Sequence, residues 1–256
     1  MAKPVLLAQI SDLHIGGSED GREPLARVEA VIESIRTLPN APDAVLVSGD
    51  LADAGGTEEY GIARELLGRL ALPLHVLNGN HDDRGRIRAA FDLPGEGEAP
   101  VNYSTDVGEL RLVVLDSNVP GQDPGRYSPE QLRWLDAELG SQPQRPTLLA
   151  LHHPPLATGT PQWDRINLEP DQRPGLAEVV ARHSQLRAIV GGHLHRAAAS
   201  ALGGCPVLSV PSAFLQVRPD FIAGKVEFVD PPGFALHALR DGELSSQVES
   251  VSFATP

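Results

Sequence analysis

Short apolar runs alternate with longer amphipathic stretches along most of this 256-residue chain. Six runs have the length and aliphatic composition of buried strands, namely residues 5–10, 44–47, 74–77, 112–115, 148–151 and 188–190. Apolar residues recur at helical spacing in residues 23–38, 57–70, 128–139 and 176–183. Strands that alternate with helices in this way predict an α/β fold built in layers.

Two of the predicted helices begin with a recognisable signal. Thr57 has a side chain that can cap a helix N-terminus. Ser128 is followed by Pro129, a residue favoured at the first helical position. We therefore expect these two helices to start at Thr57 and Ser128.

The pattern changes after Gly192. The apolar runs that follow are short, are joined by Gly, Pro and Asp turns, and cover residues 206–210, 225–229, 234–239 and 246–252. We expect one domain over residues 1–256, in which residues 206–256 complete a second, more antiparallel sheet. Residues 92–102 and 154–174 are rich in Gly and Pro, and loops of that length are often functional.

Composition and charge limit the partners of the chain. Hydrophobic residues make up 41% and charged residues 21% of it, which is ordinary for a globular protein. The formal net charge is −13, and an acidic protein repels nucleic-acid polymers and anionic membranes. A small phosphate ester is still compatible with this charge, because bound dications reverse the local potential.

The sequence also favours a cytoplasmic location. Cys205 is the only cysteine, so no intramolecular disulfide can form. The N-terminal stretch is too short and too weakly apolar for a signal peptide, and no stretch approaches the roughly 18 apolar residues of a membrane helix.

Five short motifs rich in metal-binding side chains follow the predicted strands in a fixed order. They are Asp12-Leu13-His14, Gly49-Asp50, Gly79-Asn80-His81-Asp82, His152-His153 and Gly192-His193-Leu194-His195. Ligands of open α/β sheets bind beyond the carboxyl ends of the strands, so we expect the motifs to converge at one edge. Asp, His and Asn side chains are ligands that Zn, Mn and Fe accept.

A single Asp or His in such a motif is more simply explained as a polar residue that caps a turn. Six of the nine histidines lie in the five motifs, however. Alternation along an extended chain also points Asp12 and His14 the same way. The glycines at 49, 79 and 192 fit sharp turns where the backbone passes close to a ligand. Together the motifs favour one metal site over five unrelated turns.

In this order, the motifs D-x-H, G-D, G-N-H-D, H-H-P-P and G-H-x-H resemble those of the calcineurin-like metallophosphoesterase superfamily. Residues 152–159 and 192–196 are most similar to bacterial class III cyclic-nucleotide phosphodiesterases and their glycerophosphodiesterase relatives. The resemblance runs from Ile10 to about Phe221. It implies a four-layer αββα sandwich, in which two mixed β-sheets lie face to face between flanking helices.

The resemblance also implies two adjacent divalent metal ions. One ion would bind Asp12, His14, Asp50 and His195, and the other would bind Asp50, Asn80, His152 and His193, with Asp50 bridging. Mn, Fe, Zn and Co all suit these ligands. Two such ions about 4 Å apart can share a hydroxide and clamp both oxygens of an in-line displacement at phosphorus.

Three residues are expected to take part in catalysis: Asp50, Asn80 and His81. By resemblance, His81 would donate a proton to the leaving alkoxide or stabilise its charge. Asp82 would support the ligands without binding metal itself. His153 is left out of the ligand set, because the first histidine of such a pair is usually the ligand.

The expected activity is hydrolysis of a small phosphodiester, a cyclic nucleotide or a glycerophosphodiester, by a metal-bridging hydroxide. A phosphomonoesterase or a nucleotide-sugar pyrophosphatase on the same fold is one alternative. A non-catalytic scaffold for a protein partner is another, although such proteins normally lose ligands and this chain keeps all seven. The resemblance further suggests a homodimer or a larger homo-oligomer.

Two residues near the motifs have two interpretations each, and two more are candidates for the substrate pocket. Asp116 either reaches the site or serves a turn, and Arg196 either contacts a substrate phosphate or braces a loop. Trp163 and Asp164 follow the His-His-Pro-Pro motif, where related enzymes shape the substrate pocket.

Overall fold

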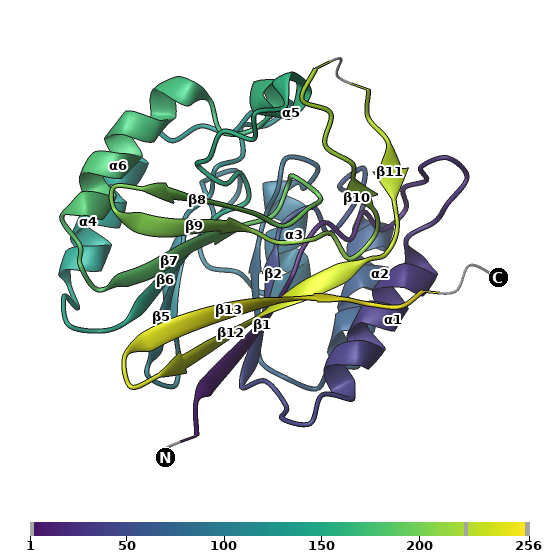
Figure 1. Cartoon of the computed structure of the whole chain (residues 1–256), viewed down its shortest axis with the longest axis horizontal. Helices are drawn as coiled ribbons and strands as arrows, with labels where there is room; N and C mark the ends of the chain where they lie inside the picture. The colour runs from purple at the N-terminus through teal and green to yellow at the C-terminus, as the bar shows by residue number, and fades with distance from the viewer. Residues whose placement is uncertain (1–2, 223–224, 254–256) are drawn as a thin grey trace.

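The computed structural model describes residues 3–222 and 225–253, and most of its strands form two sheets that lie face to face (Figure 1). The first sheet contains β1 (Val5–Ile10), β2 (Ala44–Ser48), β3 (Leu74–Leu77), β12 (Gly233–Arg240) and β13 (Glu243–Ser250). The second contains β4 (Tyr103–Val107), β5 (Leu110–Val114), β6 (Thr147–Ala150), β7 (Leu186–Gly191), β8 (Ala198–Leu202) and β9 (Cys205–Ser209). Their orders are β13-β12-β1-β2-β3 and β4-β5-β6-β7-β9-β8, and β10 (Gln216–Val217) pairs separately with β11 (Phe228–Val229).

Helices cover the outer faces of both sheets (Figure 1). The first sheet carries α1 (Leu25–Arg36), α2 (Thr57–Gly68) and α3 (Arg84–Phe91), and the second carries α4 (Pro129–Gly140) and α6 (Arg173–Ala181). The connection from β6 to β7 also holds α5 (Pro161–Ile166) and the 3₁₀ helix η1 (Pro170–Gln172). Both sheets contain parallel and antiparallel pairs, so the predicted four-layer αββα sandwich is confirmed. In the described ranges, no helix combines the length and the hydropathy needed to cross a membrane.

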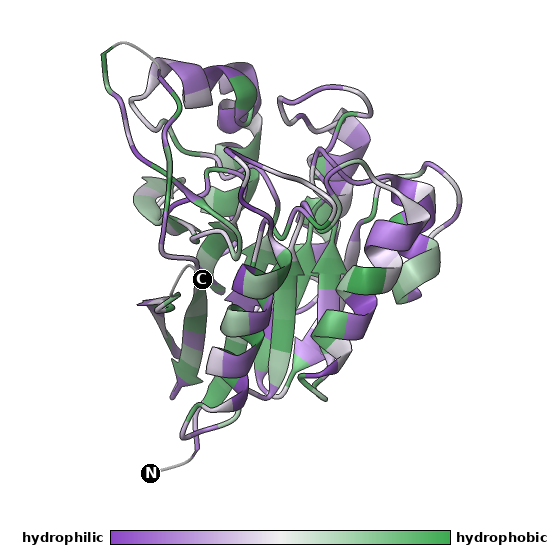
Figure 2. Cartoon of the chain, turned by 90° about the vertical axis from the view of Figure 1, so that its right-hand side faces the viewer, coloured by the Kyte–Doolittle hydropathy of each residue, from purple (hydrophilic) through white to green (hydrophobic). Residues whose placement is uncertain are grey.

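Alternate side chains of the inner strands enter different cores. Leu46 of β2 and Leu148 of β6 meet between the two sheets, whereas Val45 and Val47 pack beneath the helices of the first sheet. Leu149 packs beneath the helices of the second sheet. Because both faces of these strands are buried, they are apolar at successive positions rather than at every second one. Figure 2 shows the result as strongly hydrophobic strands behind helices of mixed character.

Both predicted helices begin within one residue of the expected start, but only one of the two predicted caps is confirmed. Ser128 caps α4 as expected: its hydroxyl accepts from the amide of Gln131 over 3.2 Å, and the Gln131 side chain accepts from the amide of Ser128 over 3.1 Å. Thr57 does not cap α2, because the helix begins at Thr57 and Gly56 holds the capping position. The Glu59 carboxylate accepts from the amide of Gly56 over 2.6 Å, which gives this end its polar partner.

The strands after residue 205 divide between the two sheets, which corrects the prediction that residues 206–256 complete the second one. Only β9 lies in the second sheet among the predicted strands of this part, and it pairs parallel to β7. The hairpin β12–β13 instead extends the first sheet, with β12 antiparallel to β1. The reason is that β1, buried through most of its length, needs a partner on each edge, and β2 supplies only one. Residues 223–224 and 254–256 of this part lie outside the described residues.

Candidate metal centre

The five motifs lie in loops that leave the carboxyl ends of β1, β2, β3, β6 and β7. Hydrogen bonds join these loops to one another. The amide of Asp12 donates to the carbonyl of Gly49 over 3.1 Å, and the amide of Gly192 donates to the carbonyl of His152 over 3.0 Å. The amide of His193 donates to the Asp12 carboxylate over 3.0 Å, which ties the second sheet to the first. The motifs therefore meet at one edge of both sheets.

The backbone is left-handed at five of the predicted ligands. These are Asp12 (φ 53°), His14 (φ 47°), Asp50 (φ 51°), His193 (φ 65°) and His195 (φ 47°). Non-glycine residues held in such conformations cost about 1–3 kcal/mol each, and they cluster at functional sites. The strained residues lie where the five side chains converge, as is typical of a functional site.

Two glycines lie where a larger residue would collide with a predicted ligand. A Cβ atom at Gly49 would lie 2.4 Å from Nδ1 of His152, and the φ of Gly49 is +95°. A Cβ atom at Gly79 would lie 2.1 Å from Oδ1 of Asp50. Both glycines are required because the backbone passes directly behind a predicted ligand.

His14 and His195 face each other through ring nitrogens that both carry lone pairs. Nδ1 of His14 donates to the Asp53 carboxylate over 3.0 Å, and Nδ1 of His195 donates to a backbone carbonyl over 2.9 Å. In the neutral rings, Nε2 is therefore unprotonated on both sides, yet the two Nε2 atoms are 3.1 Å apart. Oxygens of Asp50 and Asp12 lie 3.7 Å from Nε2 of His14 and of His195, respectively. A cation bound among these atoms would satisfy all four side chains.

A second group of donors lies beside the first. Nδ1 of His152 donates to the Ser48 carbonyl over 2.8 Å, which leaves its Nε2 3.1 Å from Oδ2 of Asp50 and 3.2 Å from Oδ1 of Asn80. The Asn80 oxygen is also 3.1 Å from Nδ1 of His193. Nε2 of His193 is buried and has no hydrogen-bond partner among the described residues. Nitrogen lone pairs and acceptor oxygens thus face one another, which is the donor set of a divalent transition metal.

Burial and the Asp50 carboxylate shift the pKa values of His152, His193 and His195 in different directions. Burial alone would lower the pKa of the His152 imidazole, but the Asp50 carboxylate outweighs it and raises the pKa to about 9. Burial lowers the pKa of His195 to about 4 and that of His193 well below its ordinary value. A neutral imidazole is the form that binds metal. The lowered pKa values keep His193 and His195 in this form.

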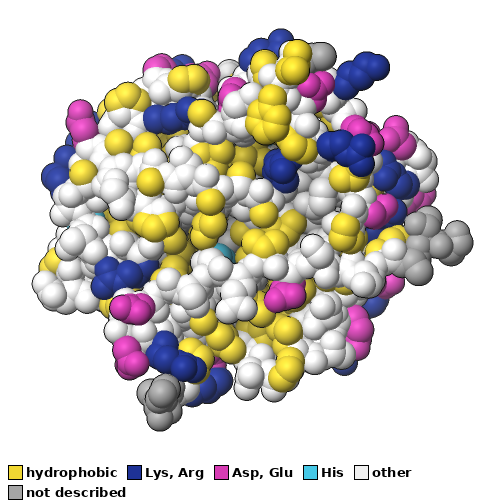
Figure 3. Space-filling view, in the orientation of Figure 1, with side chains coloured by type: hydrophobic (Ala, Val, Ile, Leu, Met, Phe, Trp, Pro, Cys, Tyr) yellow, Lys and Arg dark blue, Asp and Glu magenta, His cyan; other side chains and the backbone are white. Residues whose placement is uncertain are grey.

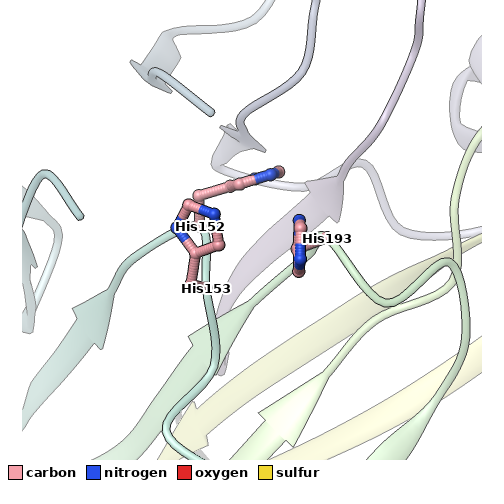
Figure 4. Close-up of side chains that lie close together, drawn as sticks. All are labelled: His152, His153 and His193. Carbon is pink, nitrogen blue, oxygen red and sulfur yellow. The ribbon is translucent and has the colours of Figure 1, made fainter. Parts of the chain in front are cut away.

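His153 uses both of its ring nitrogens in hydrogen bonds. Nε2 donates to the carbonyl of Asp123 over 2.9 Å, and Nδ1 accepts from the Ser117 hydroxyl over 2.8 Å. The ring lies beside His152 and His193, which come from the ends of neighbouring strands (Figure 4). Burial lowers the pKa of His153 to about 3. This geometry favours a neutral residue that lines the site.

His81 differs from the buried motif histidines, because its side chain is 39% exposed. Its amide donates to the Asp50 carboxylate over 2.9 Å, and its Nδ1 donates to the carbonyl of Asp53 over 2.7 Å. The ring packs edge-on against His14, with the centroids 4.7 Å apart. A polar cavity of about 210 Å³ opens beside it. His81 therefore lies between the predicted ligands and solvent, where a substrate group can reach it.

A sequence profile of the calcineurin-like phosphoesterases matches residues 5–197 of this chain. The chain belongs to the calcineurin-like phosphoesterase family. The resemblance predicted from the five motifs is thus confirmed, and relatives of the expected kind are found. A glycerophosphodiester phosphodiesterase of Enterobacter lignolyticus is 33% identical in an alignment that covers 83% of this chain and 79% of that protein. A 3′,5′-cyclic adenosine monophosphate phosphodiesterase of Pseudomonas aeruginosa is 32% identical in an alignment that covers 96% of this chain and 90% of that protein.

A solved structure shows the same fold at much lower identity. The purple acid phosphatase of yellow lupin, Lupinus luteus, matches 98% of this chain with a TM-score of 0.74 and 16% sequence identity. The match covers 52% of that protein, so this phosphoesterase chain spans about half its length. The comparison supports the layered fold alone.

Asp82 braces two loops of the phosphoesterase site. Its carboxylate accepts from the amides of Gly79, Leu51 and Ala52 over 2.9, 3.3 and 3.2 Å. It also accepts from the Tyr60 hydroxyl over 3.1 Å. Burial and the Asp50 charge raise the pKa of Asp82 to about 6. All of these partners lie outside the predicted ligand set, as expected of a supporting residue.

Asp53 is a functional residue that sequence reasoning missed. Its carboxylate fixes the ring of His14, and its carbonyl fixes the ring of His81. The bond to the His14 imidazole lowers the pKa of the Asp53 carboxyl. The only signal in the sequence is an acidic residue three positions after Asp50, which does not show which rings it orients.

Asp116 fits the turn interpretation, because its carboxylate accepts from the backbone two residues later, and it also holds more distant groups. It is fully buried and pairs with Arg84 at the start of α3 over 2.8 Å. It also accepts from Asn78 over 3.1 Å and from the amide of Asn118 over 2.8 Å. Asn118 in turn donates to the carbonyl of Asp82 over 3.2 Å. Asp116 thus anchors the segment that carries Asn80 and His81 of this phosphoesterase. It does so through Asn78 and Arg84, without contacting a proposed ligand.

Three candidate pocket residues lie in segments that follow strands of the second sheet. They are Trp163, Asp164 and Arg196. Nη1 of Arg196 donates to the carbonyl of Val217 over 3.1 Å, which favours the loop-bracing interpretation. The Asp164 carboxylate accepts from the amide of Thr158 over 2.6 Å, within its own loop. The Trp163 ring centroid is 5.9 Å from that of His193.

Proposed function

We propose that this family member hydrolyses small phosphodiesters with two bound divalent metal ions. The observation that carries the proposal is the buried group in which imidazole lone pairs face one another and face acceptor oxygens. The names of the two bacterial relatives, both phosphodiesterases, support a diester as the substrate. A cyclic nucleotide or a glycerophosphodiester is the proposed class.

The proposed ligand sets follow the two groups of donors. Asp12, His14, Asp50 and His195 would hold one ion, and Asp50, Asn80, His152 and His193 would hold the other. When bound, such ions supply Lewis acidity toward phosphoryl oxygens and lower the pKa of water. Mn, Fe, Zn and Co all suit imidazole, carboxylate and amide ligands, and we propose one of these four as the native metal.

The roles proposed for the protein groups come from their exposure and bonding. Asp50 keeps the two ligand sets together, and its second oxygen holds the amide of His81. His81 has Nδ1 committed to the carbonyl of Asp53, so its Nε2 is the atom that can face a substrate. We propose that the imidazolium form of His81, which carries a proton on Nε2 as well, stabilises the leaving ester oxygen by a hydrogen bond or by transfer of that proton.

Turnover of bis(p-nitrophenyl) phosphate tests the proposal. After chelation and addition of Mn²⁺, the wild-type chain should cleave this diester, and Asp50→Asn and Asn80→Ala should lose at least about a hundredfold in kcat/KM. Asp92→Asn is the matched control, because Asp92 has the same left-handed backbone (φ 53°) but caps α3 away from the site. Wild-type turnover in Asp50→Asn would contradict the mechanism.

The same assay separates the alternatives. Faster cleavage of p-nitrophenyl phosphate than of the diester would favour a phosphomonoesterase. A wild-type chain that binds no Mn²⁺, Zn²⁺ or Fe²⁺ in metal analysis would favour a scaffold. Neither alternative has an observation of its own in this structure.

Two further proposals concern the surroundings of the enzyme. We propose a cytoplasmic location and a homodimer, both of which come from the sequence. Light scattering of the purified chain at several concentrations measures its mass in solution and so tests the dimer. A single species with the 27.3 kDa mass of one chain would contradict it.

A further inference from the structure

An apolar cavity of about 190 Å³ opens beside the proposed metal site. Its walls come from two parts of the chain that lie far apart in sequence: Leu156 and Trp163 before β7, and Leu194, Val217 and Phe221 after it. Figure 1 places α5 next to the segment after β10 at the top of the molecule. Figure 3 shows hydrophobic side chains gathered there, with Lys and Arg side chains close by.

Trp163, which lines the cavity, lies close to two histidines of the site. The Trp163 ring centroid lies 5.9 Å from that of His193 and 6.2 Å from that of His195. Leu194, which lines the cavity, is the residue between these two histidines. A group that contacts Trp163 in the cavity is therefore near two proposed metal ligands, His193 and His195.

The wall that carries Trp163 is held in place by its own hydrogen bonds. The Asp164 carboxylate accepts from the amides of Thr158 and Gly159 over 2.6 and 3.1 Å. The amide nitrogen of the Asn167 side chain donates to the carbonyls of Pro154 and Leu156 over 2.9 and 3.0 Å. These bonds tie α5 and the residue after it to the loop that precedes α5. They hold Trp163, which lies on α5, in a defined position.

Two kinds of ester group suit a wall of Trp163 and Phe221. An uncharged flat ring can stack on such side chains, and a quaternary ammonium group can bind to their faces. Arg196 decides between them, because it also lines the cavity. Its guanidinium donates to the carbonyl of Val217, and no carboxylate of the described residues forms an ion pair with it. The charge that remains repels a cation, whereas guanidinium N–H groups favour a ring with acceptor atoms.

We propose that this cavity binds an uncharged aromatic ring on one ester group of the substrate, and that Trp163 and Arg196 determine this specificity. The inference rests on the proposed function and narrows its substrate class. Diesters of ring-bearing alcohols such as nucleosides are favoured over diesters of choline.

A binding experiment tests the cavity without any turnover. The chain has two tryptophans, so Trp134→Phe leaves Trp163 as the only one. In this variant, free of metal, adenosine should quench the Trp163 fluorescence in a saturable way, because the ring stacks on the indole. Choline at the same concentrations should not. Equal quenching by both compounds, or quenching by neither, would overturn the proposal.

A turnover experiment tests the specificity. With Mn²⁺ added, the wild-type chain should prefer 3′,5′-cyclic AMP to glycerophosphocholine. Trp163→Ala should lower the ratio of the two kcat/KM values about tenfold, mainly through the KM for cyclic AMP, since one stacking contact is lost. Trp163→Phe should restore most of the ratio, and Arg196→Gln should raise the relative rate on glycerophosphocholine. Trp134→Phe should keep the wild-type ratio, because Trp134 lies on α4, partly buried against the core of the second sheet.

The two experiments separate the failure of this inference from that of the proposed function. If diesters are cleaved but the ratio is unchanged in Trp163→Ala, the specificity assignment is wrong and the phosphodiesterase stands. If no diester is cleaved while adenosine still quenches Trp163, the proposed function is wrong and the ring-binding cavity stands.

Discussion

His237 shows how strongly the surroundings of one residue set its chemistry. It lies outside the five motifs and is fully buried on β12. Nε2 donates to the side-chain oxygen of Gln9 over 2.9 Å, and Nδ1 accepts from the Ser246 hydroxyl over 2.7 Å. Burial lowers the pKa of this imidazole to about 4. His237 is therefore a neutral packing residue that links three strands.

This shifted pKa predicts a pH-dependent stability. Because the pKa of His237 is about 4 in the folded chain against the ordinary 6.5, the unfolded chain binds more protons between these values. Its contribution is present above pH 6.5 and is lost as the pH falls through this window. Between pH 7 and pH 5 the loss should be about 2 kcal/mol in the free energy of unfolding. Urea unfolding of metal-free wild type and His237→Gln at both pH values measures it, and equal losses would contradict the assignment.

At the residue scale, the sequence marks the proposed ligands but not all of the residues that hold them in place. Asp12 and His195 stand in short motifs whose order and residue types are informative by themselves. Asp53 and Arg84 act through bonds to a ring or a carboxylate far away in sequence. Any exposed acid or base in a loop has the same local pattern, so only the folded arrangement distinguishes them.

At the scale of elements, the inner strands were predicted well because burial on both faces gives them continuous apolar sequences. The helix α3 was not predicted, because it buries Arg84 and Arg88 beside Ile87 and so lacks an apolar stripe. The strand β8 was not predicted either. It lies at the edge of the second sheet and its residues are mostly exposed, so no apolar run marks it.

The loop between β3 and α3 predicts a sharp difference between two glycine substitutions. Gly79→Ala should lower the stability of the metal-free chain by about 1–3 kcal/mol and weaken metal binding, since its Cβ would lie 2.1 Å from Oδ1 of Asp50. Gly61→Ala is the matched control in the exposed middle of α2, where a Cβ meets nothing within 4 Å. It should raise stability by about 0.5–1 kcal/mol. Urea unfolding and calorimetric titration with Mn²⁺ compare the two, and equal metal affinities would show that the loop tolerates a side chain.

At the scale of the whole molecule, the pairing of distant strands is what the sequence left undetermined. The pattern of β12 predicts a strand but does not say which edge it joins. That choice depends on β1, more than 220 residues earlier, with Val5 opposite Leu239. The convergence of the motifs was predictable because it follows from strand direction alone, whereas the division of the last strands between the sheets was not.

The proposed metal ligands come from both sheets, so metal should stabilise the molecule as a whole. β1, β2 and β3 of the first sheet lead to Asp12, His14, Asp50 and Asn80, and β6 and β7 of the second lead to His152, His193 and His195. A ligand that binds only the folded chain at a hundred times its Kd adds about 2.7 kcal/mol to its stability. For a chain of this length that corresponds to a rise of roughly 5–10 °C in Tm.

Thermal unfolding with and without chelator measures this coupling. Chelation should lower the Tm of the wild type, and Mn²⁺ should restore it. His152→Ala should have a Tm that responds less to either treatment, because one of the two proposed ligand sets loses a histidine of the second sheet. His75→Ala is the control, since His75 lies on β3 outside the ligand set and should keep the full shift. A wild-type Tm that does not change on chelation would mean that the two sheets are not joined through metal, since every ion that bridges them must be released before they separate.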